Sequence, residues 1–395
     1  MSIHFHKLTV ADVRRETAEC VSVAFEVPDE IKSLFQYQPG QNITVKILIN
    51  NKEVRRSYSI CSGVHENELR IAVKEAPGGI FSGWANRELL KGQFLDLLPP
   101  TGRFIVHPDS KNKKRYLAIA AGSGITPILS IISSILHHEP LSSFTLLYGN
   151  RNRASIIFRD QLDALKNRFM SRFALHHVLS REITDAEIYS GRITALKCEE
   201  MSANLIDFPL MDEIFICGPE PMIFEIKDWL LGRKIASNKI HYELFTIPVS
   251  QGMDRLAVTS ASAPLAAGID LHGLTSAAAP SAAEKIPTGS YDPETTAATE
   301  IPISDITVKL DGISFNFKLP FEGKTILEAA LDQGADLPFS CKGGVCSTCR
   351  AKLVEGQVAM DLNYALEPEE VEAGFILCCQ SHPLTKKVVI DFDQK

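Results

Sequence analysis

A chain of 395 residues is long enough for two or three domains, and its 45% hydrophobic and 23% charged residues exclude a disordered, collagen-like or rod-like protein. The formal net charge of −7 argues against broad electrostatic binding of nucleic acid. The start MSIHFHKLTV lacks the basic and apolar regions of a signal peptide, and Gly122, Gly124 and Pro127 interrupt the one long apolar run, residues 117–136. We therefore expect a cytoplasmic protein with no membrane span.

Residues 1–108 read as short strands. Within residues 42–49, NITVKILI, every second side chain is apolar, and Asn50-Asn51 then predicts a turn. The segment LRIAVK, residues 69–74, alternates in the same way. Many short strands separated by glycine and proline predict a small antiparallel β-barrel.

Two motifs in this barrel suit a flavin. RSYS follows a predicted strand and offers a guanidinium for phosphate, a flat aromatic ring and a hydroxyl for the reactive edge of the flavin. Downstream, a Gly-Gly pair and a serine can place backbone amides and a hydroxyl on a phosphate at a helix start. The alternative is an ordinary barrel with a surface arginine and a glycine turn. The candidate residues are Arg56, Ser57, Tyr58, Ser59, Lys74, Gly78, Gly79 and Ser82.

Residues 109–245 alternate between apolar strand-like and helical segments, which predicts an α/β domain with a parallel sheet. The loop AGSGITP between a strand and a helix lets a pyrophosphate approach the helix start, and CGP follows another strand at the same sheet edge. Arg151 and Arg153 suit a 2′-phosphate and favour NADPH over NADH, unless they simply face solvent. Cys217 is either beside the nicotinamide or a small core residue. The other candidates are Gly122, Ser123, Gly124, Thr126, Pro127 and Gly218.

Residues 246–301 are rich in Ala, Ser, Thr and Pro and nearly lack aromatic side chains. Such a composition buries too little apolar surface to offset its chain entropy, so this segment predicts a flexible linker.

Five of the nine cysteines lie in the last domain, residues 302–395. Cys341, Cys346 and Cys349 have the C-x4-C-x2-C spacing of a plant-type 2Fe–2S site, which needs a fourth, distant cysteine. Cys378 and Cys379 are the two candidates for that ligand. Buried free thiols or a zinc site are the alternatives, although zinc more often uses paired C-x2-C knuckles.

The ordered motifs RSYS, GGIFS, GSGITP and CGP resemble the ferredoxin–NADP reductase superfamily, and the C-terminal cysteines resemble oxygenase reductases with a fused 2Fe–2S ferredoxin. Longer strings, such as YLAIAAGSGITP, EIFICGPEPM and the segment from GADLPFSCKGG to ILCCQ, resemble the reductase subunits of phenylacetyl-CoA epoxidases. The resemblance implies a β-grasp fold for the last domain and FAD, rather than FMN, as the flavin. It covers essentially the whole chain except the linker.

Residue roles follow from this resemblance. It implies that Ser59, Cys217 and Glu243 act at the flavin and nicotinamide, with Phe245 beside the flavin. It implies Cys379 as the fourth cluster ligand, because Gln380 follows it as in the family pattern.

The expected function is electron transfer from NADPH through FAD and the 2Fe–2S cluster to an oxygenase, expected to be a multisubunit diiron enzyme that epoxidises phenylacetyl-CoA. The reductase of another oxygenase is the first alternative: a ring-hydroxylating dioxygenase, or an alkane or amine monooxygenase. A redox carrier or sensor without turnover and a zinc-binding interaction module are the others. A cluster of acidic residues in the last domain could steer docking onto the acceptor, or could be only a solvated surface. These residues are Asp361, Glu367, Glu369, Glu370 and Glu372.

Overall fold

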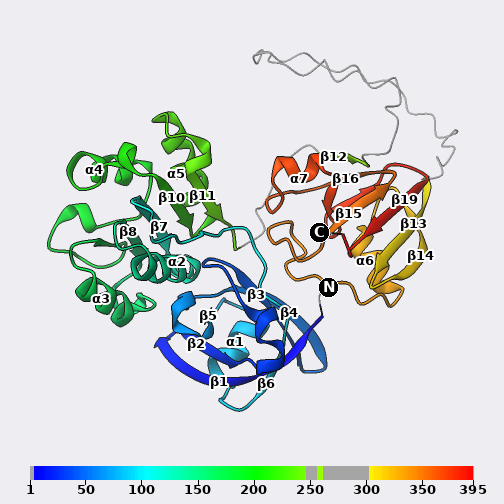
Figure 1. The fold of residues 1–395 in the computed structure, drawn as a ribbon, viewed down its shortest axis with the longest axis horizontal. Helices are drawn as coiled ribbons and strands as arrows, with labels where there is room; N and C mark the ends of the chain where they lie inside the picture. Colours follow the sequence, from blue (N-terminus) through cyan, green and yellow to red (C-terminus); the bar gives the residue numbers. More distant parts are fainter. Residues whose placement is uncertain (1–3, 246–255, 261–301, 395) are drawn as a thin grey trace, which may run out of the picture.

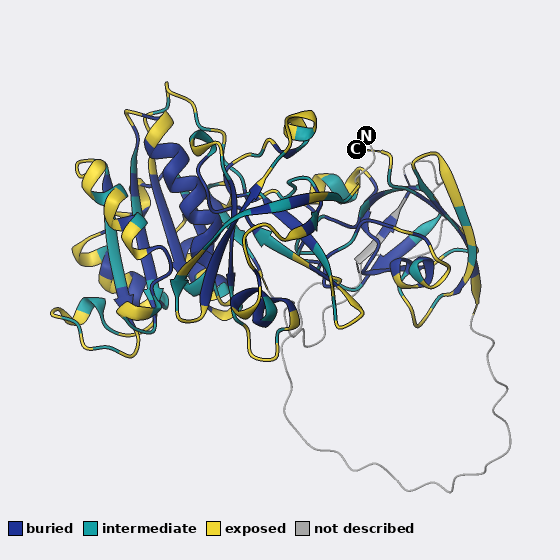
Figure 2. Cartoon of the chain, turned by 90° about the horizontal axis from the view of Figure 1, so that it is seen from below, coloured by how far each residue is buried: buried dark blue, intermediate teal, exposed yellow. Residues whose placement is uncertain are grey.

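The computed structural model describes residues 4–245, 256–260 and 302–394, which form an N-terminal barrel, a central α/β domain and a C-terminal domain (Figure 1). Buried residues occupy the interior of each domain (Figure 2). None of the helices in these residues is both long enough and apolar enough to cross a bilayer.

The N-terminal strands pair antiparallel in the order β4-β3-β6-β1-β2-β5, and a bridge from Ile60 to Ile71 joins the two ends into a barrel. Asn50 and Asn51 both have positive φ and form the predicted turn, since the left-handed conformation suits a two-residue hairpin and asparagine tolerates it. The elements are β1 (His6–Thr17), β2 (Cys20–Glu26), β3 (Asn42–Ile49), β4 (Lys52–Ser59), β5 (Leu69–Lys74), α1 (Ile80–Arg87) and β6 (Phe94–Leu97).

The central domain has a parallel sheet in the order β11-β10-β7-β8-β9, as the alternating pattern predicted. The apolar run at residues 117–136 divides into the buried strand β7 and the buried helix α2. The strands are β7 (Arg115–Ala121), β8 (Ser143–Asn150), β9 (Phe173–Leu179), β10 (Glu213–Cys217) and β11 (Ile240–Glu243), and the helices are α2 (Ile125–His138), α3 (Arg159–Arg168), α4 (Ala195–Asn204) and α5 (Glu220–Gly232).

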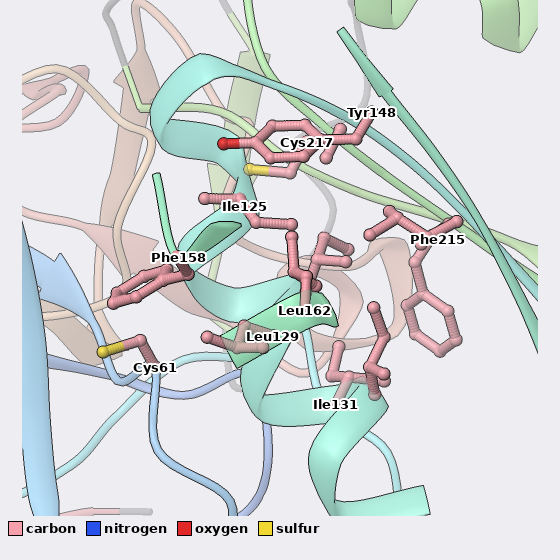
Figure 3. Packing of buried hydrophobic residues seen from close by; sticks show 14 of the residues in the cluster. Cys61, Ile125, Leu129, Ile131, Tyr148, Phe158, Leu162, Phe215 and Cys217 are labelled. Carbon is pink, nitrogen blue, oxygen red and sulfur yellow. The ribbon is translucent and has the colours of Figure 1, made fainter. Parts of the chain in front are cut away.

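Helices cover both faces of this sheet. One apolar cluster packs α2 and α3 against the strands, and part of it, including Ile125, Leu162 and Phe215, is drawn in Figure 3. A second cluster packs α4 and α5 against the opposite face. Helix α4 was not predicted, because the apolar residues of its segment ALKCEEMSAN form no clear helical stripe.

The C-terminal domain has a five-stranded sheet in the order β14-β13-β19-β15-β17 and a three-stranded sheet in the order β12-β16-β18. Helix α6 contributes buried residues to the same core. The elements are β12 (Leu256–Thr259), β13 (Ile303–Leu310), β14 (Ile313–Pro320), α6 (Ile326–Asp332), β15 (Arg350–Glu355), β16 (Gln357–Met360), α7 (Pro368–Glu372), β17 (Phe375–Leu377), β18 (Ser381–Pro383) and β19 (Lys387–Asp391).

The linker prediction needs one correction. Strand β12 lies within residues 246–301, yet it pairs antiparallel with β16 and buries Val258 in the core of the C-terminal domain. Four residues are too few to produce a periodic signal, and their strand exists only because β16 offers a pairing partner. The rest of the predicted linker lies outside the described residues.

Candidate functional site

A cavity of about 940 Å³ opens at the carboxyl ends of the parallel strands β7, β8 and β10. Gly122, Ser123 and Gly218 line it, as does Lys74 from the end of β5 in the barrel. Loops at this edge of an open α/β sheet are where nucleotides bind in such folds. The cavity therefore lies where the GSGITP and CGP motifs were expected to act. Residues of both the barrel and the α/β domain line it.

The turn between β7 and α2 is packed too tightly for side chains. A Cβ atom on Gly124 would lie 2.1 Å from the carbonyl oxygen of Cys217, and Gly122 has a φ of +54°. Thr126 and Pro127 are buried in α2 behind the turn, and the Thr126 hydroxyl donates a hydrogen bond to the Ser123 carbonyl at 3.1 Å. The two glycines thus bring the start of α2 to the sheet edge, where its backbone amides suit a phosphate.

Four arginines lie in or near the cavity, beyond the ends of strands β8 and β9. Arg151 lines the cavity but pairs with Glu19, and Arg153 pairs with Glu182 at 3.3 Å and lines a neighbouring cavity instead. Arg181 and Arg192 follow β9 and line the main cavity, and no sequence motif indicated them. Neither of these two forms an ion pair with an acidic residue that the structure describes.

Ser59 and Glu243 meet where the barrel contacts the α/β domain. The Ser59 hydroxyl donates a hydrogen bond to Glu243 Oε2 at 3.1 Å. Burial raises the pKa of Glu243 to about 8, while hydrogen bonds from Ser59 and Asn42 act in the opposite direction. The carboxyl group therefore keeps its proton to a higher pH than an ordinary glutamate and can supply or hold a proton beside the RSYS motif.

Cys217 does not line the cavity. Its side chain is fully buried in the same apolar cluster as Ile125 and Tyr148 (Figure 3), and burial raises its pKa well above the usual value. Its side chain therefore fits the core alternative, although β10 pairs Cys217 with Glu243 in register. Phe245, at the end of this segment, is 40% exposed and lines the cavity.

The two predicted flavin motifs lie at the end of β4 and just before α1. Tyr58 packs against Phe81 with ring centroids 5.4 Å apart, and Arg56 is exposed. Gly78 and Gly79 line a cavity of about 470 Å³ beside α1. A Cβ on Gly79 would lie 2.3 Å from Ser82 Oγ, and Gly78 has a φ of +70°, so the turn requires glycine and exposes backbone for a close approach. These residues fit a phosphate-bearing flavin.

Four thiols gather in the C-terminal domain. The Sγ atoms of Cys341 and Cys346 lie 3.1 Å apart, and the Cys379 thiol interacts with both Cys341 and Cys349. Hydrogen bonds from Cys346, Cys379 and backbone amides lower the pKa of Cys341, whereas the same contacts between thiols raise the pKa values of Cys346 and Cys379. The donor set fits a 2Fe–2S cluster.

The neighbouring Cys378 is different. It is fully buried among apolar side chains, and burial raises the pKa of its thiol. Cys378 therefore packs in the core, while the adjacent Cys379 lies with the other thiols and suits the cluster.

Residues 7–105 match the oxidoreductase FAD-binding domain family, residues 118–228 the oxidoreductase NAD-binding domain family and residues 308–384 the 2Fe-2S iron-sulfur cluster binding domain family. Fold and site together define a modular reductase that binds FAD, a pyridine nucleotide and a 2Fe–2S cluster.

The chain is 39% identical over 391 residues to a subunit of the 1,2-phenylacetyl-CoA epoxidase of Escherichia coli strain K12, covering 99% of this chain and 98% of that protein. It is 31% identical to the 3-ketosteroid-9-alpha-monooxygenase ferredoxin reductase component of Rhodococcus rhodochrous, covering 98% and 96%. The chain belongs to this family of flavin and iron–sulfur reductase components, which transfer electrons to oxygenases. Phthalate dioxygenase reductase shares the fold, with a TM-score of 0.53, 21% identity and 98% coverage of both chains.

Proposed function

We propose that this chain takes electrons from NADPH and delivers them to a multisubunit diiron oxygenase that epoxidises phenylacetyl-CoA. The full-length 39% identity to a phenylacetyl-CoA epoxidase subunit carries the choice of acceptor. FAD, when bound, accepts a hydride from the nucleotide and passes single electrons to the 2Fe–2S cluster. The residues of the chain bind and orient these cofactors and hold a proton near the flavin.

The arginines at the cleft support NADPH as the donor. Arg181 and Arg192 line the cavity without an acidic partner in the described part of the chain, whereas Arg151 and Arg153 form exposed ion pairs with Glu19 and Glu182. An unpaired guanidinium can form strong charge-assisted bonds to a 2′-phosphate, which NADH lacks. The proposal therefore assigns the 2′-phosphate to Arg181 and Arg192.

Arg181→Ala tests this assignment, and Arg153→Ala is the matched control. Loss of one charge-assisted contact is expected to raise the KM for NADPH by about tenfold or more and to leave the KM for NADH nearly unchanged. Arg153→Ala is expected to change neither constant. Steady-state ferricyanide reduction with each nucleotide gives both values, and equal effects of Arg181→Ala on the two nucleotides would contradict the assignment.

In the proposed catalytic centre, Ser59 positions the hydride acceptor and connects it to the proton on Glu243 through their hydrogen bond. Lys74 contributes positive charge at the boundary, with its Nζ 3.6 Å from the position that a Cβ on Gly122 would occupy. Cys341, Cys346, Cys349 and Cys379 hold the cluster.

Reconstitution tests the acceptor. The holoprotein, NADPH and the purified oxygenase subunits of a phenylacetyl-CoA epoxidase are expected to consume oxygen only when phenylacetyl-CoA is present. Coupled turnover with a ketosteroid oxygenase but not with the epoxidase would assign the chain to another oxygenase system.

A further inference from the structure

The C-terminal domain contacts the barrel through the segment that leads into its first cluster cysteine. Asp336, Leu337, Phe339 and Ser340 precede Cys341, and all four contact side chains of strand β4. This strand also carries the RSYS motif. Figure 1 shows β4 on the side of the barrel that faces the C-terminal domain.

Strand β4 carries both the side chains that contact the C-terminal domain and the RSYS motif. Successive side chains of a strand point to opposite faces, so Arg55, Ser57 and Ser59 share one face and Arg56 and Tyr58 share the other. Arg55 and Ser57 reach the C-terminal domain, with Ser57 Oγ and Ser340 Oγ 2.7 Å apart. Only one residue separates Ser57 from Ser59, and Ser340 is bonded to Cys341.

Arg55 is the most heavily engaged side chain at this boundary. Its guanidinium lies 3.2 Å from Asp336 Oδ1 and donates a hydrogen bond to the Leu337 carbonyl at 3.3 Å. It also lies between two aromatic rings, 4.2 Å from the Phe339 centroid and 4.9 Å from the Phe5 centroid. The side chain is only 6% exposed, so the C-terminal domain and the N-terminal segment together remove it from water.

A buried cation is costly unless its partners surround it. Glu53 accepts a hydrogen bond from Arg55 Nε at 2.7 Å within the barrel, and the remaining partners come mainly from the C-terminal domain. Separation of the two domains would remove those partners and return the guanidinium to water. Arg55 can thus hold the cluster segment in place and still allow release.

We propose that Arg55 is the positioning residue that docks the ferredoxin domain on the flavin domain for electron transfer from flavin to cluster. This inference rests on the proposed function, since it concerns the internal step of that pathway. The step that this docking would serve is the transfer of one electron from reduced flavin to oxidised cluster, in which no bond would form or break. Arg55 carries no electron and only sets the distance and orientation.

Within the described residues, an arginine–carboxylate pair and a histidine–carboxylate contact also join the C-terminal domain to the rest of the chain. Arg103 lies 2.6 Å from Glu370, and His4 lies 3.2 Å from Asp311. The side chains of His4 and Arg103 are 64% and 36% exposed, so salt screens these pairs more than it screens Arg55. Release by moderate salt is therefore expected to be partial while Arg55 is present.

Variants of the holoprotein test the proposal. Arg55→Ala removes all contacts, Arg55→Lys retains the charge without the flat fork that stacks between rings, and Asp336→Asn weakens the contact from the other domain. Arg14→Ala is the matched control, because Arg14 is a barrel arginine paired with Asp12 at 2.7 Å, far along the sequence from β4. Asp336 is 80% exposed, so its substitution leaves folding intact even if Arg55→Ala does not.

The first readout is anaerobic stopped-flow mixing with NADPH, which separates flavin bleaching from cluster bleaching. Arg55→Ala is expected to slow cluster reduction by at least about tenfold, with flavin reduction unchanged. Arg55→Lys is expected to fall between Arg55→Ala and wild type. Asp336→Asn is expected to slow cluster reduction by up to about fivefold, and Arg14→Ala by less than about twofold.

The second readout does not depend on turnover. Backbone hydrogen exchange in residues 336–340 is expected to be faster in Arg55→Ala than in wild type at low salt, with unchanged exchange in β13 and β19. Cluster content and the electron paramagnetic resonance spectrum of the reduced cluster are expected to remain those of wild type. A role of Arg55 limited to barrel stability would alter flavin content and leave exchange in residues 336–340 unchanged.

The two proposals fail in different ways. Cluster reduction and exchange in Arg55→Ala that both match wild type would overturn the docking role. A wild-type protein whose flavin NADPH cannot reduce would overturn the proposed donor, and the exchange experiment would still decide the docking role.

Discussion

Glu243 shows how loss of solvation can prepare a side chain for proton chemistry even against opposing hydrogen bonds. Its usual pKa of 4.5 rises to about 8 because the protein interior solvates a carboxylate poorly. The resemblance to known reductases indicated this residue, but its protonation depends on how Ser59 and Asn42 from the barrel close over it. Neither neighbour lies near Glu243 in the sequence.

The raised pKa of Glu243 gives a pH dependence of stability with a definite sign. Between pH 4.5 and about 8 the folded protein keeps a proton that the unfolded chain releases. The free energy of unfolding therefore falls as pH rises through this window, by up to about 1.4 kcal/mol per pH unit. Glu243→Gln, which does not titrate, is expected to lose this slope.

Denaturant unfolding of wild type and Glu243→Gln across that window measures the difference. Exposed Glu30 provides the control, and Glu30→Gln is expected to follow the wild-type profile. Parallel profiles for wild type and Glu243→Gln would show that the buried carboxyl group titrates normally.

The arginines near the cavity come from separate parts of the sequence. The two arginines after β8 stay a predicted 2′-phosphate site, and their acidic partners, Glu19 and Glu182, come from the barrel and from the loop after β9. Arg181 and Arg192 became candidates only when the fold placed them on the cavity wall. Arg181 lies just after β9, so its position at a strand end was the one feature of the sequence that could have indicated it as a nucleotide-binding residue.

At the scale of elements, the turn from β7 to α2 was fully readable in the sequence. An apolar run, then two glycines, then a proline and a second apolar run predict a strand, a tight turn and a buried helix. The reason that Gly124 must be glycine was not readable, because the obstructing atom is the carbonyl oxygen of Cys217, on β10.

Gly124→Ala is expected to raise the Kd for NADPH by about tenfold and to lower the free energy of unfolding by about 1–3 kcal/mol, because the turn must move away from β10. Gly232 ends α5 and has no atom within 4 Å of an added Cβ, so Gly232→Ala serves as the control. It is expected to be neutral or to stabilise by up to about 1 kcal/mol. Equal affinities in the two variants, from fluorescence titration, would mean that the turn tolerates a side chain.

Elements that depend on partners were harder to predict than elements that carry their own pattern. Strand β12 pairs with β16, and α4 is stabilised by a few buried residues and by the hydrogen bond that the Lys197 N–H donates to the Thr194 hydroxyl. The acidic residues of the C-terminal domain are also partly committed, since Glu370 pairs with Arg103 and Arg350, and Asp361 pairs with His382. Their role in acceptor docking stays a prediction.

At the scale of the whole molecule, separate domains hold the flavin and the cluster. The cluster can therefore be lost while the flavin-dependent reaction continues. Cys378 and Cys379 offer a sharp test, because the two neighbours differ in surroundings and not in chemistry.

Cys379→Ser is expected to lower cluster-dependent cytochrome c reduction by at least about tenfold and to spare flavin-dependent ferricyanide reduction. Cys378→Ser is expected to keep both activities and to lower the free energy of unfolding by about 1–3 kcal/mol, because a buried hydroxyl replaces a thiol. Visible absorbance and iron content monitor the cluster in each variant. Loss of the cluster in Cys378→Ser alone would reverse the assignment of the fourth ligand.

Short stretches of sequence were enough to predict the domain order, the barrel and parallel-sheet classes, the cofactor motifs and the first three candidate cluster cysteines. These features are local, because they depend on alternation, glycine turns and cysteine spacing. The folded chain was needed to show which arginines of the described residues lack acidic partners, which of two adjacent cysteines turns toward the other thiols, and that Arg55 joins two domains. Those outcomes depend on contacts between residues as far apart as Arg55 and Asp336, and such contacts exist only after folding has excluded water from between them.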